Sequence, residues 1–220
     1  MKQNRNFLIL GVTGGAGSGK TTVVEQIEKV VPTVFLHCDI IAHKLMEPGK
    51  ASYDALVKEF GEEILEDATL KGSPISRPKL SKIAMATEEN RRRLNELTHP
   101  LVQQAVEKEL GRLTEENFHG VAVIEAALLI EAGYKSICDS LWYVHAPLSH
   151  RIRRMKEKRG YSDEKIANIL AGQLSETEFK ANADVILANP DGDKSEVLAE
   201  LQKQIRILLK DYVESTDEMW

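Results

Sequence analysis

The sequence predicts an α/β fold in which helices cover both faces of a five-stranded parallel sheet. Three observations predict it. Five short runs are apolar throughout instead of alternating, as in strands that are buried on both faces. Segments with helical periodicity separate these runs, so right-handed crossovers would join the strands. A glycine-rich loop directly follows the first run. The five runs are residues 7–12, 34–38, 121–124, 141–145 and 185–187.

The first run leads into Gly14–Thr21, which fits the G-x-x-x-x-G-K-[ST] pattern of phosphate-binding loops. Glycines let successive N–H groups turn toward phosphate oxygens. The lysine would contact the β- and γ-phosphates, and the threonine hydroxyl would bind Mg²⁺. A helix over 22–30 would follow, with its N-terminus toward the anion. The predicted ATP-binding residues here are Gly15, Ala16, Gly17, Ser18, Gly19, Lys20, Thr21 and Thr22, with Thr21 also the metal ligand.

Asp39 directly follows the second run. Ligands of open α/β sheets bind at the carboxyl ends of the strands, and a carboxylate there can take the proton of an attacking hydroxyl. The alternative is that Asp39 caps a helix over Ile40–Met46. His37 and His43 flank it, and a single histidine is more often structural than functional.

A long segment from residue 39 to 120 separates the second and third runs. Helical patterns occur over 51–60, 77–85 and 88–97, and Pro100 is expected to start another helix to Leu113. No strand is expected. We interpret this segment as a helical insertion on one side of the sheet.

Glu125 closes the third run, where phosphotransferases often keep an acid that holds Mg²⁺-bound water; the alternative is a cap for the next helix. After the fourth run, Pro147 would begin a basic helix. Such a helix is usually a solvated face, but this position suits a lid whose arginine stabilises phosphoryl transfer. The cluster comprises Arg151, Arg153, Arg154, Lys156, Lys158 and Arg159, and a last amphipathic helix is expected over Lys194–Val213.

Composition narrows the function classes. The 220 residues suit one domain, and the net charge of −5 argues against a nucleic-acid partner. The two cysteines, Cys38 and Cys138, have no metal-type spacing and suggest reduced thiols. No run approaches the ~18 apolar residues of a membrane span, and no signal-peptide pattern opens the chain. We therefore expect a cytoplasmic protein.

Seven blocks, in order and spacing, resemble the dephospho-coenzyme A kinase family over nearly the whole chain. No single block after the loop is specific by itself, whereas the seven together are. They are Thr13–Thr21, His37–His43, Glu47–Gly49, Leu97–Pro100, Ala127–Glu131, Arg154–Lys158 with Gln173, and Ala183–Asn189.

The resemblance implies a three-layer P-loop kinase fold with a five-stranded parallel sheet, a helical acceptor-binding insertion and a helical lid. The core would comprise about 1–46, 118–148 and 183–214, the insertion about 47–117 and the lid about 149–182, all in a single domain.

It also implies Mg²⁺-dependent transfer of the ATP γ-phosphate to the 3′-hydroxyl of dephospho-CoA, the last step of coenzyme A biosynthesis, in the cytoplasm. Asp39 would be the base, while Lys20 and Arg154 would neutralise the moving group. Asn189 would lie near the adenine, and Asp39, His99 and Leu128 would bind the acceptor. The expected partners are ATP and dephospho-CoA, with no nucleic acid or membrane, for a monomer or weak homo-oligomer.

The chain departs from the family pattern at four positions, and at one of them Ala127 replaces a proline. His37 and His43 replace an aspartate and an arginine, and Lys158 stands at the second lid arginine, with Arg159 beside it. The nearest rival is another small-molecule P-loop kinase, with a nucleoside monophosphate or sugar acceptor. A GTP-hydrolysing switch would carry N-K-x-D, a tetrapeptide that this sequence lacks, and the acidic charge disfavours a nucleic-acid-binding ATPase.

Overall fold

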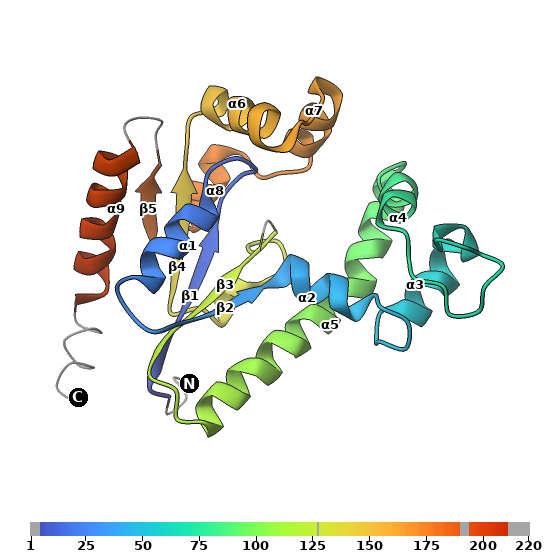
Figure 1. Ribbon diagram of the computed structural model, residues 1–220, viewed down its shortest axis with the longest axis horizontal. Coiled ribbons are helices and arrows are strands. Elements are labelled where there is room, and N and C mark those ends of the chain that lie inside the picture. Colours follow the sequence, from blue (N-terminus) through green and yellow to red (C-terminus); the bar gives the residue numbers. More distant parts are fainter. Residues whose placement is uncertain (1–4, 127, 190–193, 211–220) are drawn as a thin grey trace. The chain divides into compact units, whose positions relative to one another are not determined.

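The computed structural model describes residues 5–126, 128–189 and 194–210. Its contacts divide the chain into two compact units, one of residues 1–36 with 113–220 and one of residues 37–112. The first unit contains the sheet and the glycine-rich loop, and the second is helical (Figure 1).

The five predicted strands are confirmed, with each boundary within one residue of its expected position. They are β1 Phe7–Thr13, β2 Thr33–His37, β3 Gly120–Glu125, β4 Ser140–His145 and β5 Val185–Ala188. The sheet is parallel, in the order β2-β3-β1-β4-β5. Because β1 lies between β3 and β4, the loop after β1 emerges in the middle of the carboxyl edge, where ligands of open α/β sheets bind.

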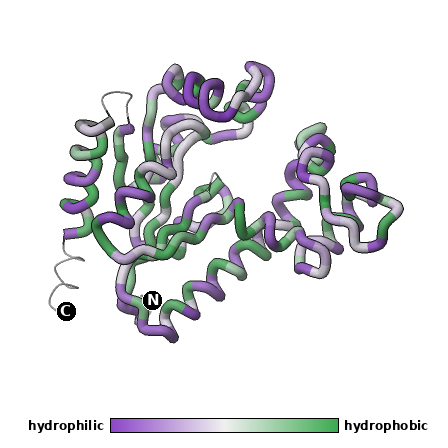
Figure 2. The backbone as a smooth tube through the Cα atoms, viewed as in Figure 1, coloured by the Kyte–Doolittle hydropathy of each residue, from purple (hydrophilic) through white to green (hydrophobic). Residues whose placement is uncertain are grey.

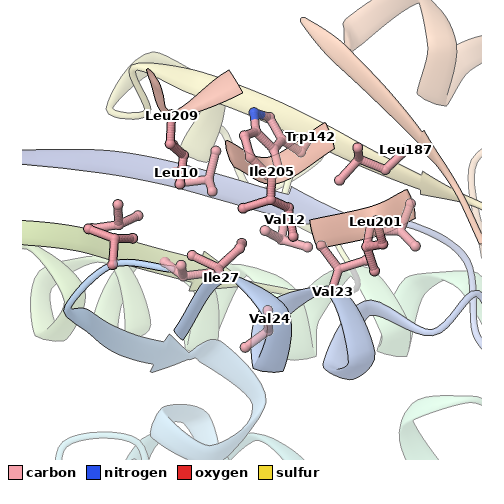
Figure 3. Close-up of a cluster of buried hydrophobic side chains, with 14 residues drawn as sticks. Leu10, Val12, Val23, Val24, Ile27, Trp142, Leu187, Leu201, Ile205 and Leu209 are labelled. Atoms are coloured by element: carbon pink, nitrogen blue, oxygen red, sulfur yellow. The ribbon is translucent and has the colours of Figure 1, made fainter. Parts of the chain in front are cut away.

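One face of the sheet is covered by α1 (Lys20–Glu28) and α9 (Lys194–Leu208), whose apolar stripes meet the side chains of four strands (Figure 3). Each fully buried side chain of this kind stabilises the fold by about 1.5–3 kcal/mol. The cluster includes Leu10, Val12, Val23, Ile27, Val123, Trp142, Val144, Leu187, Leu201 and Ile205. The amphipathic helix predicted at the end of the chain is confirmed, and Leu201, Ile205 and Leu209 are buried in this cluster.

Tyr143 alternates with Trp142 and Val144 along β4 and so points to the opposite face. There its ring stacks on Phe179 of α8 (Glu176–Asn182), with ring centroids 4.9 Å apart. On the same face, a Cβ at Gly11 would lie 2.8 Å from Leu141 Cδ1. Glycine in β1 therefore allows close packing of the second layer.

Three helices fill the chain between β4 and β5, in the predicted lid. They are α6 Leu148–Arg159, α7 Asp163–Ala171 and α8, which begins with a capping box of Ser175 and Glu178. Figure 2 shows hydrophobic residues along the strands and a largely hydrophilic α6.

The second unit has its own apolar core. It contains α2 Cys38–Leu45, α3 Tyr53–Phe60, the 3₁₀ turn η1 Glu62–Ile64, α4 Arg77–Ala84 and most of α5 Glu88–Glu115. The core is Tyr53, Leu56, Phe60, Ile64, Leu65, Ile75 and Leu80. Among the described residues of this unit beyond His37, the only β-type pairing is the isolated bridge between Leu65 and Ile75. The structure therefore has no strand in the described residues between 39 and 119, in agreement with the prediction.

The prediction that Pro100 starts a new helix is wrong, because α5 runs through it without a break. A proline inside a helix removes one hydrogen bond and costs about 3 kcal/mol. Apolar side chains pack on both sides of it: Val102 and Val106 after it are buried, and Leu94 and Leu97 before it are partly buried against the apolar core. This burial offsets the cost, and tertiary packing thus overrides the local signal.

Candidate active site

The loop after β1 has the backbone that its glycines allow. Gly14, Gly17 and Gly19 have φ values of 150°, 78° and 93°, which residues with a Cβ rarely adopt. Gly19 is the N-cap of α1, and the Ser18 N–H donates to the Gly15 carbonyl at 3.0 Å. The loop therefore folds back tightly before it enters the helix.

The inner side of this loop offers main-chain donors. Within the described part of the chain, the N–H groups of Gly17, Gly19 and Thr21 donate to no protein acceptor. The Lys20 ammonium donates to the Gly14 carbonyl at 2.9 Å, so its charge lies over the loop. Unpaired amides at a helix N-terminus beside a lysine form an anion site suited to phosphate.

Arg154 and Asn189, predicted as a lid residue and an adenine-side residue, come together behind this loop. The Arg154 guanidinium donates to the carbonyls of Gly17, Ser18 and Asn189 at 3.1, 3.2 and 3.0 Å. The buried Asn189 amide donates to the Ser18 carbonyl at 2.8 Å. A Cβ at Gly19 would lie 2.0 Å from Asn189 Nδ2, so the glycine is needed for this approach.

Two residues at the loop were not singled out from the sequence. Arg151 donates through Nε to the Ala16 carbonyl, and Gln173 accepts from the Ala16 N–H. In the sequence, Gln173 is only one member of the lid block, and Arg151 is one of six basic residues in the cluster on the helix after Pro147. Its position three residues before Arg154 places the two on one helix face, which is the signal that the sequence offered.

The electrostatics of this region are dominated by burial. Burial lowers the pKa of the Arg151 guanidinium, while Tyr143 and Glu176 oppose that shift. Burial also raises the pKa of Tyr143, whose hydroxyl lies 3.3 Å from His145 Nδ1. Lys158 and Arg159 are exposed at the end of α6.

Glu125 ends β3 and pairs in register with Val12 of β1. The alternative that it caps a following helix is wrong, because the next helical element among the described residues is η2 at Tyr134–Ser136. Its carboxylate and the hydroxyl of Thr21, exposed in the first turn of α1, are hard oxygen donors. The described residues contain no group of three His, Cys, Asp or Glu side chains that could hold a metal. The Glu125 carboxylate and the Thr21 hydroxyl fit Mg²⁺, which usually binds one or two protein oxygens together with substrate phosphates.

In the second unit, Asp39 is exposed in the first turn of α2. The alternative that it is an N-cap is wrong, because His37 holds that position. His43 is exposed in the last turn of α2. His99 lies half-buried on α5, and burial lowers its pKa, which favours the neutral imidazole.

Leu128 belongs to the first unit, in a turn after β3, and is partly buried. Ala127, in the same block, lies outside the described residues. Among the helices that the structure describes, none has the length and apolar character needed to cross a membrane.

Known proteins resemble this chain over most of its length. A family model described as dephospho-CoA kinase matches residues 8–195. Dephospho-CoA kinase from Lactobacillus johnsonii is 32% identical over 199 residues, which cover 89% of this chain and 97% of that protein.

Solved structures share the fold. TT1252 from Thermus thermophilus has a TM-score of 0.76 and 26% identity, covering 93% of this chain and 99% of that one. Dephospho-CoA kinase from Campylobacter jejuni has a TM-score of 0.65 and 22% identity, covering 94% and 98%. The predicted P-loop kinase fold is thereby confirmed. Because the family model matches well over half of its length, the chain belongs to the dephospho-CoA kinase family.

Proposed function

We propose that this chain transfers the γ-phosphate of ATP to the 3′-hydroxyl of dephospho-CoA, giving CoA and ADP. The observation that supports the proposal is the glycine-shaped loop, whose amides and Lys20 ammonium are suited to bind phosphate, in a chain of this family. We further propose that the reaction takes place in the cytoplasm, with the protein a monomer or weak homo-oligomer.

The loop residues Gly15–Thr22 would hold the triphosphate through main-chain N–H groups and the Lys20 ammonium. The amides are fixed before ATP arrives, so they stabilise the charge on the phosphates without reorganisation. Asn189 would lie on the adenine side.

The Thr21 hydroxyl would hold Mg²⁺, with Glu125 as a further oxygen donor from the neighbouring strand. Bound there, Mg²⁺ would neutralise charge on the β- and γ-phosphates.

The acceptor would bind through Asp39, His99 and Leu128, with the helical segment of about 47–117 forming its side of the site. Asp39 would take the proton from the attacking 3′-hydroxyl.

An acceptor screen tests this function. With ATP and Mg²⁺, we expect ADP formation to depend on dephospho-CoA, because the helical segment must recognise its acceptor. AMP, CMP and gluconate should not replace it. Phosphorylated product is measured by mass spectrometry and ADP by a coupled assay. Equal turnover with any of these other acceptors would instead favour a nucleoside monophosphate or sugar kinase.

Replacing Arg154 by alanine is expected to lower kcat by about 10- to 100-fold, more than it weakens ATP binding. Its guanidinium lies within hydrogen-bond distance of the loop, and its charge partner develops in the transition state. Steady-state kinetics and calorimetric titration with ATP separate the two effects. A loss confined to ATP affinity would contradict this role.

A further inference from the structure

Ala16, at the crest of the loop, is held by two side chains from the region after β4. Arg151 donates through Nε to the Ala16 carbonyl at 3.0 Å and through Nη2 to Gln173 Oε1 at 2.7 Å. The same Gln173 oxygen accepts the Ala16 N–H at 3.2 Å. These three contacts form a closed ring, which we call the Ala16 clamp.

The clamp is closely fitted to the glycines on either side of Ala16. A Cβ at Gly15 would lie 2.0 Å from Arg151 Nη2, and one at Gly17 would lie 2.6 Å from the Arg151 carbonyl oxygen. Only residues without a side chain let α6 approach the loop so closely. The close approach therefore involves both the side chain and the main chain of Arg151.

The clamp fixes two successive peptide planes. Gln173 holds the plane that contains the Ala16 N–H, and Arg151 holds the plane that contains the Ala16 carbonyl. In a planar trans peptide, the N–H of the next residue points away from that carbonyl. The Gly17 N–H is therefore directed away from Arg151, and it donates to no acceptor within the described residues.

We propose that Arg151 and Gln173 are positioning residues that preform the phosphate-binding loop. Arg151 acts through Ala16, by aiming the Gly17 N–H at the phosphates, and touches neither substrate. A glycine-rich loop without this clamp would lose conformational entropy when it orders around the nucleotide, which weakens binding. Gln173 follows α7, so the clamp also ties the loop to both ends of the α6–α7 segment.

The inference rests on nucleotide binding by the loop and does not depend on the acceptor, so the test is calorimetric titration of the full chain with ADP and Mg²⁺. Arg151→Met and Gln173→Leu should each raise the Kd for ADP by about tenfold, because each removes a hydrogen bond that involves a charged group or a loop amide. The double variant should bind no more weakly than the worse single variant, because both act through Ala16.

Conservative variants distinguish positioning from charge. Arg151→Lys keeps the charge but cannot donate in two directions, so it should bind ADP as weakly as Arg151→Met. Gln173→Glu keeps the acceptor oxygens and should bind within about threefold of the unmodified chain. At saturating ATP, kcat should fall less than the affinity does, because the loss is in ground-state binding.

Arg153→Met is the matched control, since it removes one positive charge from an exposed position of α6. It should leave the Kd for ADP unchanged. Thermal unfolding without nucleotide shows whether each variant is folded. If Arg151→Met is not folded, the comparison of Arg151→Lys with Gln173→Glu tests the proposal instead. The proposal is overturned if Arg151→Lys binds like the unmodified chain, or if the two single losses add fully in the double variant.

Discussion

Replacing Asp39 by asparagine is expected to lower kcat by about 10²- to 10⁴-fold while ATP still binds. Asparagine keeps the size and hydrogen-bonding shape of the side chain but cannot accept a proton. The attacking hydroxyl would then lose its base, whereas the loop that holds the triphosphate would be untouched. Asp39 lies in the first turn of α2, in a different compact unit from the loop, so its loss should leave the phosphate site intact.

Turnover at saturating ATP and dephospho-CoA, together with the Kd for ATP, measures this separation. Asp54→Asn is a matched control, because Asp54 is an exposed acid in the first turn of α3. It should have unchanged kcat. If Asp39→Asn retains full kcat, Asp39 is not the base.

Replacing Lys20 by alanine is expected to lower kcat/KM by about 10²- to 10³-fold, the typical loss when one preorganised donor to developing charge is removed. The ammonium lies 2.9 Å from the Gly14 carbonyl, so it is already directed over the loop before ATP binds. The main-chain amides of the loop cannot replace the full positive charge of this ammonium.

Steady-state kinetics as a function of ATP concentration measure the loss. Lys29→Ala removes a lysine at the other end of α1 and should behave like the unmodified chain. A Lys20→Ala enzyme with normal kcat/KM would show that the loop does not grip the phosphates as proposed.

The strands and the loop could be predicted because their signals are local. Apolar runs such as 121–124 and the glycine pattern of Gly14–Thr21 each specify their own backbone, and the structure has both. The continuity of α5 through Pro100 could not be predicted in this way. It depends on burial along the whole helix, which a local stop signal does not show.

The Ala16 clamp could not be predicted from the sequence for a related reason. Arg151 and Gln173 lie 135 and 157 residues from Ala16 in the sequence. The sequence of a basic helix does not show which of its side chains will contact a distant loop in the fold. The helix-cap hypotheses for Asp39 and Glu125 failed because the position of a cap depends on where the neighbouring helix begins. That boundary is set by packing as well as by sequence.

The central place of β1 in the sheet has a consequence for folding while the ribosome synthesises the chain. Both of its neighbours come late in the chain, with Val12 paired to Glu125 and to Trp142. At about 5–20 residues per second, the ribosome needs roughly 6–20 s after making β1 to complete its first partner. Throughout that interval the nascent apolar strand has neither of its final neighbours, whereas the contacts of residues 37–112 are all available sooner.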